Sequence, residues 1–226
     1  MKESELTIYC KNKLNLADMK LGEEYNYSCL PLAIIDAIYS ILQNYSQVQK
    51  IVENYCDYYG IEKNTDKNNV KTHTISDMIC NIESIGSDNF ANEVLKAKNR
   101  TAGSNSILKS EAVYQWAKIM HANGIENFDD FRNSDKKALK SALKNVQGQG
   151  DAAVRYLFML CGSDDFCKPD IHILRLLTEA TGEKIDKVDE VQALLEKIVD
   201  ELKNDYPSMT VRQLDYIIWN YQRKKR

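Results

Sequence analysis

Apolar residues recur every three or four positions over most of the chain, which is the spacing that one face of an α-helix requires. This pattern predicts helices over residues 30–45, 46–59, 74–85, 107–123, 134–145, 151–160, 171–177, 188–203 and 210–226. Pro31 stands near the start of the first stretch, and Gly60, Gly86 and Gly124 follow later ones, as is typical of helix ends. We find no series of alternating apolar and polar residues that indicates strands. The pattern therefore predicts an all-α protein of about ten helices.

Short polar side chains precede several of these helices and are expected to be their N-caps. Thr74, Ser134 and Thr210 stand in this position, where a side-chain oxygen accepts from a free N–H of the first turn. The polar stretch 62–71 is the one obvious loop. We interpret the last four residues, RKKR, as a frayed tail.

Two glycines stand at the mouth of the most apolar segment. The segment that follows Gly150, DAAVRYLFMLCG, is apolar almost all round and predicts a buried helix. Gly148 and Gly150 join it to the basic helix 134–145 through a very short turn. Glycines let a backbone approach a ligand closely, and the N–H groups at a helix start bind anions such as a DNA phosphate. The alternative is a plain turn between two helices, which commonly contains glycine.

A carboxylate opens the next helical segment. Asp170 follows Pro169 and precedes the apolar pattern IHILRLL, so it is expected to be the N-cap of a helix beginning near Ile171. A buried helix, a short polar loop and a Pro-Asp start would return the chain toward the hairpin. Asp170 is therefore either a cap alone or a carboxylate close to a bound phosphate backbone.

Composition narrows the class of protein. The chain has 226 residues, of which 43% are hydrophobic and 28% charged, as is ordinary for a soluble globular protein. The longest apolar run, 154–161, is interrupted by Arg155, so no membrane span and no membrane partner are expected. The start, MKESELTIYCKNKL, lacks the apolar region of a signal peptide, so we expect a cytoplasmic location. Six cysteines without a CxxC pair predict free, buried thiols. The net charge of −3 argues weakly against a nucleic-acid partner, although basic residues cluster at 96–100 and 136–144.

The segment VQGQGDAAVRYLFMLCG followed by KPDIHILRLL resembles the helix-hairpin-helix (HhH-GPD) DNA glycosylase superfamily, including bacterial members with a similar KPD ending. The resemblance places Gly148 and Gly150 on the two hairpin glycines and Asp170 on the catalytic aspartate. It is looser upstream, where LPLAIIDAIYSILQNYSQVQKI is similar to the first core helix and the DNA-probing loop. It implies one glycosylase-like unit over 1–226, in which two helical subdomains enclose a cleft. The parts would be a helical subdomain over about 30–145, a hairpin and catalytic segment at 146–177 and C-terminal helices at 187–226.

The resemblance also implies roles for single residues. The residues expected to contact DNA are Gly148, Gln149, Gly150, Lys168, Arg175 and Lys109. Those expected to line the base pocket are Tyr156, Tyr39, Trp116 and His172, whereas Trp219 is interpreted as core. The family's lyase lysine is replaced by Ala152, and no C-terminal cysteine cluster exists for an iron–sulfur centre. No metal is expected in catalysis, although Na⁺ or K⁺ at hairpin carbonyls is implied.

These expectations amount to a monofunctional DNA glycosylase, acting as a monomer on DNA. Such an enzyme takes a damaged or modified base out of the stack and hydrolyses its N-glycosidic bond, and a carboxylate stabilises the positive charge that builds on the sugar. A non-catalytic helix-hairpin-helix DNA-binding protein and a helical interaction protein are the alternatives. A binding-only protein has no use for a carboxylate beside phosphates, so Asp170 favours the enzyme.

Overall fold

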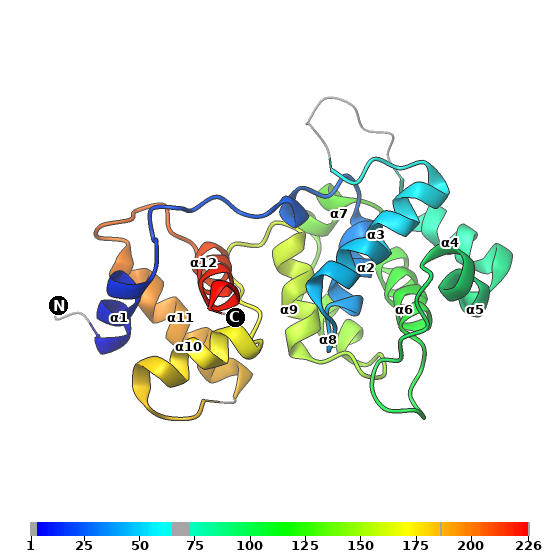
Figure 1. Cartoon of the computed structure of the whole chain (residues 1–226). Coiled ribbons are helices and arrows are strands. Elements are labelled where there is room, and N and C mark those ends of the chain that lie inside the picture. The colour runs from blue at the N-terminus through cyan, green and yellow to red at the C-terminus, as the bar shows by residue number, and fades with distance from the viewer. Residues whose placement is uncertain (1–3, 65–72, 186, 226) are drawn as a thin grey trace. The chain divides into compact units, whose positions relative to one another are not determined.

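The computed structural model describes residues 4–64, 73–185 and 187–225, and within these ranges it contains twelve α-helices and no β-strand (Figure 1). The expected all-α class is confirmed. The chain divides into two compact units. The central unit is Glu23–Gly162, and the terminal unit combines Met1–Gly22 with Ser163–Arg226. None of the described helices is long and apolar enough to cross a membrane.

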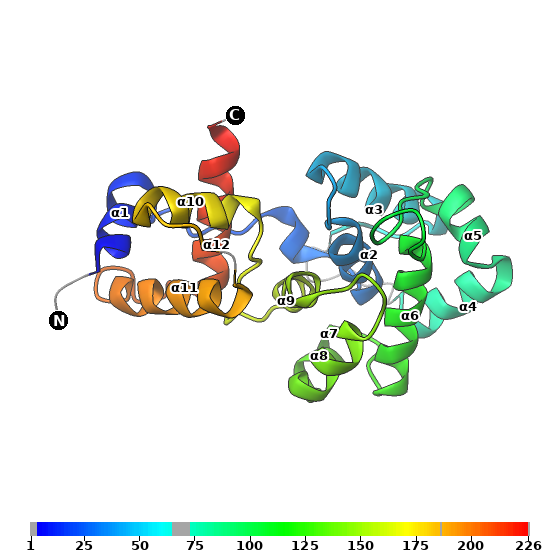
Figure 2. The ribbon, with the colours of Figure 1, turned by 90° about the horizontal axis from the view of Figure 1, so that it is seen from below.

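The central unit is built around α2 (Leu30–Tyr39), all ten residues of which are buried. Helices α3, α6 and α9 pack against it, and α6 also packs against α4 and α8 (Figure 2). The elements of this unit are η1 (Glu23–Asn26), α3 (Tyr45–Tyr59), α4 (Ile75–Ile85), α5 (Ser87–Asn89), η2 (Phe90–Val94), α6 (Lys109–Ala122), α7 (Phe128–Asn133), α8 (Lys136–Lys144) and α9 (Asp151–Leu160).

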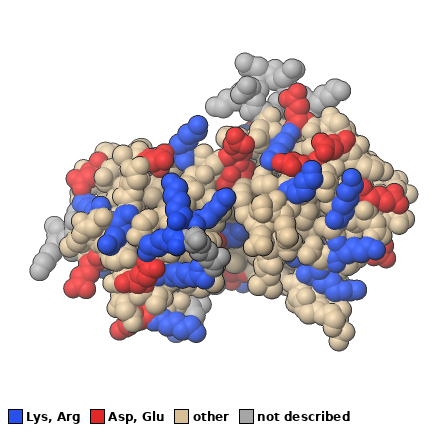
Figure 3. All heavy atoms as spheres, viewed as in Figure 1, with Lys and Arg blue, Asp and Glu red and all other residues tan. Residues whose placement is uncertain are grey.

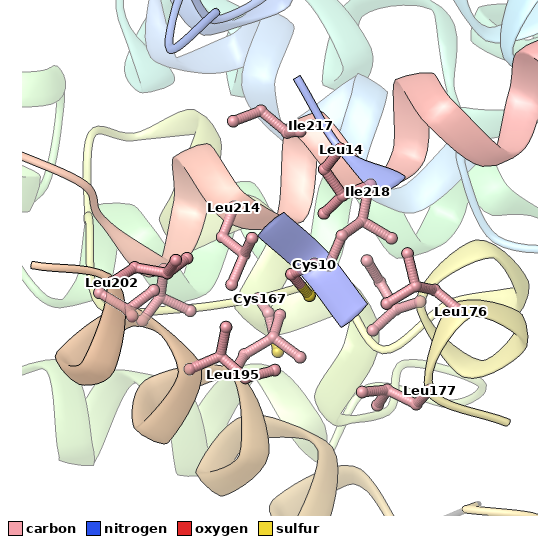
Figure 4. Packing of buried hydrophobic residues seen from close by; sticks show 14 of the residues in the cluster. Cys10, Leu14, Cys167, Leu176, Leu177, Leu195, Leu202, Leu214, Ile217 and Ile218 are labelled. Carbon is pink, nitrogen blue, oxygen red and sulfur yellow. The ribbon is translucent and has the colours of Figure 1, made fainter. Parts of the chain in front are cut away.

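The terminal unit has its own apolar core. Its helices are α1 (Glu5–Lys13), α10 (Ile171–Thr181), α11 (Val188–Leu202) and α12 (Val211–Lys224). Leu176, Leu195 and Leu214, from three of them, meet Cys10 of α1 in one buried cluster (Figure 4). Ser4 and Thr7 fasten α1 to α11, because both hydroxyls donate to Glu201 Oε2, at 2.7 Å and 2.6 Å.

Several predicted elements match the structure closely. Helix α3 ends at Gly60, which adopts a left-handed φ of 65°. Helices α4 and α12 begin with capping boxes at Thr74 and Thr210. Helix α9 begins at Asp151 and is buried from Ala153 onward, as its apolar pattern predicted.

Other predictions need correction. The first predicted helix ends at Tyr39 rather than near residue 45, and a turn separates it from α3. Asp135, not Ser134, caps α8, because its carboxylate accepts from two first-turn N–H groups. Of the predicted frayed tail 223–226, Arg223 and Lys224 belong to helix α12, and Arg226 lies outside the described residues. Of the predicted loop 62–71, residues 62–64 are not helical, and 65–71 lie outside the described residues.

The six cysteines are free thiols, as expected, and five of them are buried. Cys80 is the exception, since it is exposed on α4.

Candidate active site

The hairpin between α8 and α9 depends on Gly148. Its φ of 79° is left-handed, and a Cβ at this position would lie 2.5 Å from the side chain of Thr101. The segment that carries Thr101 also meets the hairpin through Gln147, whose Oε1 accepts the N–H of Ile107 at 3.3 Å. Gly150 differs, since its φ is −96° and a Cβ there would meet no atom within 4 Å. The first glycine is therefore required by the fold, and the second is not.

Gln149, between the two glycines, points into the protein. Its side chain is 4% exposed, although we expected it to contact DNA. Its N–H donates to the Val146 carbonyl at 3.0 Å and closes the turn. Within the described part of the chain, neither side-chain amide atom has a hydrogen-bond partner. The Gln149 side chain thus occupies a buried position, where an apolar residue would be expected, and its amide is unpaired. It is not exposed for a contact with DNA.

Asp151, the first residue of α9, sits between two lysines of α8. Lys140 lies 2.9 Å from its Oδ1 and Lys144 lies 2.7 Å from its Oδ2. Burial opposes ionisation, but the hydrogen bonds from these lysines hold the pKa of Asp151 below its usual value. The anion-binding end of α9 therefore already has a carboxylate beside it, paired with the nearest cations.

Asp170 is the N-cap of α10, as the sequence predicted. Its Oδ1 accepts the N–H groups of His172 at 2.8 Å and Ile173 at 3.3 Å. Both bonds end on Oδ1, which leaves Oδ2 for another partner. The side chain is partly exposed. Asp170 belongs to the terminal unit and the hairpin to the central unit, so their approach to one another stays a prediction.

Three further candidates surround Asp170 in the terminal unit. His172 packs edge-on against Trp219 of α12, with 6.2 Å between ring centroids. Arg175 lines an apolar hollow of about 280 Å³ on α10, together with Ile171. Lys168 is partly exposed, two residues before Asp170. These residues share the neighbourhood of Asp170, and their contacts with DNA or a base stay predictions.

The other expected pocket residues belong to the interior of the central unit. Tyr39 and Trp116 are fully buried, and the indole N–H of Trp116 donates to the Leu143 carbonyl at 3.0 Å. Tyr156 is 5% exposed, and its hydroxyl is 3.4 Å from Asp36 Oδ2. Burial raises the pKa of Tyr156 well above its usual value, and Asp36 raises it further. None of these rings shows an open face on which a base could stack.

Lys109 is likewise a structural residue rather than a surface cation. It is 2% exposed, and its ammonium donates to the carbonyls of Tyr39 at 3.1 Å and Ile41 at 2.5 Å. It therefore ends α2 and fixes the turn that follows. We expected Lys109 to contact DNA, and its burial excludes a direct contact with a phosphate in this conformation.

Leu42, in that turn, is a feature that the sequence reading missed. It is 89% exposed and has a φ of 56°, an uncommon backbone conformation for a residue with a branched side chain. The turn is anchored on both sides: Lys109 binds the Ile41 carbonyl, and Ser40 Oγ donates to the buried Asp36 at 2.7 Å. A rigid turn thus displays a large apolar side chain, although display to water is unfavourable. An apolar residue just before the polar pair Gln43–Asn44 was the available signal.

Lys and Arg side chains gather on the terminal unit around the C-terminal end of α12 (Figure 3). Arg223, Lys224 and Lys225 are exposed there. The Arg223 guanidinium lies 4.9 Å from the ring centroid of Trp219, and Lys225 pairs with Glu179 at 2.7 Å.

The described residues contain no group of three or more His, Cys, Asp or Glu side chains that could hold a metal ion.

A family model described as "Domain of unknown function (DUF8548)" matches residues 4–223. The chain belongs to this family. No curated protein sequence matches the DUF8548 chain. Its fold, however, resembles that of solved structures.

The DUF8548 chain is similar in structure to DNA-bound 8-oxoguanine glycosylases. A complex of the Methanocaldococcus jannaschii 8-oxoguanine glycosylase/lyase with 8-oxoguanine DNA aligns with a TM-score of 0.51 and 17% identity, over 98% of this chain and 87% of that one. The Clostridium acetobutylicum glycosylase/lyase complex gives 0.54 and 9%, over 87% and 61%. A complex of MBOgg1 with a low-affinity DNA ligand gives 0.59 and 13%, over 87% and 60%.

At these identities the likeness establishes the fold alone, and it confirms the expected all-helical, glycosylase-like fold. The chain spans about three fifths of the MBOgg1 and Clostridium chains.

Proposed function

We propose that this protein is a monofunctional DNA glycosylase that removes a damaged or modified base and leaves an abasic site. The observation that carries the proposal is the geometry of the Asp170 carboxylate. It caps α10 in a fold shared with 8-oxoguanine glycosylases, and both cap bonds end on one of its two oxygens. The second oxygen is the one proposed to act on the substrate.

In the proposed reaction Asp170 acts electrostatically. The base is extruded from the duplex, because its glycosidic bond is out of reach within the stack. As that bond breaks, positive charge builds on the sugar, and the carboxylate stabilises it or orients the attacking water. No metal is needed for this step.

The lyase step of the structural neighbours is not proposed here. The proteins from Methanocaldococcus jannaschii and Clostridium acetobutylicum are glycosylase/lyases. Ala152, in the first turn of α9, offers no amine to form a Schiff base with the sugar. The expected product is therefore an intact strand with an abasic site.

DNA binding is proposed to use the hairpin and the turn that carries Leu42. The N–H groups at the start of α9 would hold one phosphate, and Leu42 would enter the base stack as an apolar wedge. The hairpin's carbonyl oxygens suit a hard cation such as Na⁺ or K⁺, although the Val146 carbonyl already accepts the Gln149 N–H. Such an ion would add positive charge beside the phosphate.

The test is an excision assay on oligonucleotides that carry alkylated, oxidised, deaminated and hypermodified bases. On any substrate found, Asp170→Asn should keep the cap, since Asn caps about as well as Asp, and should abolish base release. Asp170→Ala should lose both activity and about 1 kcal/mol of stability. Borohydride should trap no covalent complex. Full base release by the Asn variant would leave Asp170 as a cap alone.

The alternative is a DNA-binding protein without catalysis, which would share the hairpin. Gly150→Pro removes the N–H proposed to meet the phosphate, whereas Gly150→Ala keeps it and fits the available space. We expect only the proline variant to lose affinity in a gel-shift titration at fixed salt. DNA binding that depends on this N–H, together with no base release across the panel, would favour the alternative.

A further inference from the structure

The loop that leads to Asp170 is held by two buried polar side chains. Gln192 of α11 accepts the N–H of Cys167 at 3.1 Å and donates to the Asp165 carbonyl at 2.6 Å. Asp215 of α12 accepts the N–H of Lys168 at 2.9 Å through Oδ1. The two side chains are only 7% and 5% exposed. Polar groups are costly to bury, so two of them on one short loop indicate that its path is fixed.

The end of this loop is tight. The N–H of Asp170 donates to the Lys168 carbonyl at 2.6 Å, across Pro169. Proline fixes its own φ, and the hydrogen bond closes the turn around it, so the geometry of these three residues is constrained. The acceptor oxygen on Asp215 therefore anchors the turn that carries Asp170.

Resting on the proposed function, we infer that Asp215 is a positioning residue for Asp170. It holds the Lys168–Asp170 turn while it stays uncharged, so that the single negative charge of the two neighbouring carboxyl groups lies on Asp170.

The charges around Asp215 support this assignment. Burial raises the pKa of Asp215 well above its usual value, and the neighbouring Asp170 raises it further. The N–H and the ammonium group of Lys168 act in the opposite direction. The elements packed against α12 carry further charged or titratable side chains, among them His172, Arg175 and Glu179 on α10, Glu196 and Lys197 on α11, and Asp164 in the preceding loop, which pairs with Arg212. When one carboxyl of a pair is held neutral, the other carries the charge.

If Asp215 served only as a hydrogen-bond acceptor, it would not need to be a carboxylic acid. Stability measurements distinguish such an acceptor from a carboxyl group that is held neutral. The folded pKa of Asp215 lies above the unfolded value of about 3.9, so its contribution to stability is complete below about pH 4. That contribution is lost as the pH rises through the folded pKa. Asp215→Asn does not titrate there. The melting temperature of the variant minus that of the wild type should therefore increase from about pH 4 to pH 8.

The matched control is Asp164→Asn, in the same loop, where the carboxylate is exposed and paired with Arg212. We expect no comparable pH trend from this exchange. A melting-temperature difference for Asp215→Asn that is the same at every pH would overturn the inference. If the variant does not fold, carbon-13 carboxyl NMR of the wild type decides, since the Asp215 carboxyl must titrate well above the usual range of an aspartic acid.

The positioning role has its own readout on a substrate found in the panel. Asp215→Asn keeps an oxygen for the Lys168 N–H and stays neutral, so its excision rate at pH 6–7 should lie within about threefold of wild type. Asp215→Leu lacks the acceptor and should be slower by about tenfold or more. Wild type should lose activity as the pH rises through the folded pKa of Asp215, where the two carboxylates begin to repel each other, and the Asn variant should not. An identical loss in both proteins would contradict the assignment.

Failure of the proposed function is distinguishable from failure of this inference. If no base is released by any protein while the stability trend appears, the proton on Asp215 stands and the glycosylase does not. If bases are released and the Leu variant is as fast as wild type, Asp215 does not position Asp170.

Discussion

At the scale of single residues, the three residues of the hairpin motif are constrained in different ways. Gly148 is required for its left-handed backbone and because Thr101 leaves no space for a side chain, and Gln149 is buried. Gly150 is under neither constraint. Local spacing identifies such a motif, because the helices on both sides are read from the same stretch. It does not identify Thr101, which lies nearly fifty residues earlier and leaves no space for a side chain at Gly148.

The unpaired amide of Gln149 predicts a gain in stability. Gln149→Met keeps a flexible side chain of similar size and removes two buried polar atoms that lack partners in the described structure. We expect the free energy of unfolding to rise by about 1 kcal/mol, measured by urea denaturation. Gln147→Met is the matched control: this side chain is exposed and its Oε1 accepts the Ile107 N–H, so the exchange should gain nothing and should cost up to about 1 kcal/mol. Equal effects of the two exchanges would show that burial at 149 is not the cause.

Asp151 predicts a change in DNA affinity. Asp151→Asn removes one negative charge at the start of α9 and frees Lys140 and Lys144 from their ion pairs. We expect DNA to bind several-fold more tightly, with a steeper dependence on salt because about one or two more phosphate contacts form. Fluorescence anisotropy at several salt concentrations measures both. Asp135→Asn, which removes a charge at the cap of α8, should change the affinity less; an equal change would point to net charge alone.

At the scale of elements, the sequence predicts where helices lie better than where they end. The apolar spacing located α3, α4, α6, α9 and α12, since burial of one face imposes that spacing. The same spacing wrongly extended α2 through Leu42, because the end of α2 is determined by a hydrogen bond from Lys109, seventy residues later. Helix α7, of six residues, is too short for its pattern to stand out. Interactions that are distant in sequence are the part that a local pattern does not contain.

The turn between α2 and α3 makes a prediction of its own. Leu42→Gly removes an exposed side chain and relieves the left-handed backbone, so stability should be unchanged or higher by about 1 kcal/mol. On a substrate found in the panel, excision should fall by about tenfold or more, because the wedge is lost. Lys96→Gly, at the other described non-glycine residue with a positive φ, controls for the backbone effect. A variant that is more stable and fully active would show that Leu42 has no role in catalysis.

At the scale of the whole molecule, the sequence identified the fold class and two of the site's anchors. Gly148 and Asp170 stand out because each is next to a helix that the apolar pattern already predicts. Asp215 and Gln192 did not stand out in the sequence. The available signal was a carboxylate at an otherwise apolar position of α12, between Val211 and Ile218. The expected pocket aromatics Tyr39 and Trp116 are core residues, because a ring on an apolar face is indistinguishable from one that lines a pocket until the neighbours are known.

The arrangement of the chain also determines an order of assembly. The central unit is one continuous segment, so it can fold while the chain is still being synthesised. The terminal unit cannot, because α1 must wait for α10 and α11, and Ser4 finds its partner Glu201 only 197 residues later. Until then Cys10 of α1 has no core to enter. We therefore expect the carboxylate at 170 to be set in place late in folding, after the hairpin of the central unit.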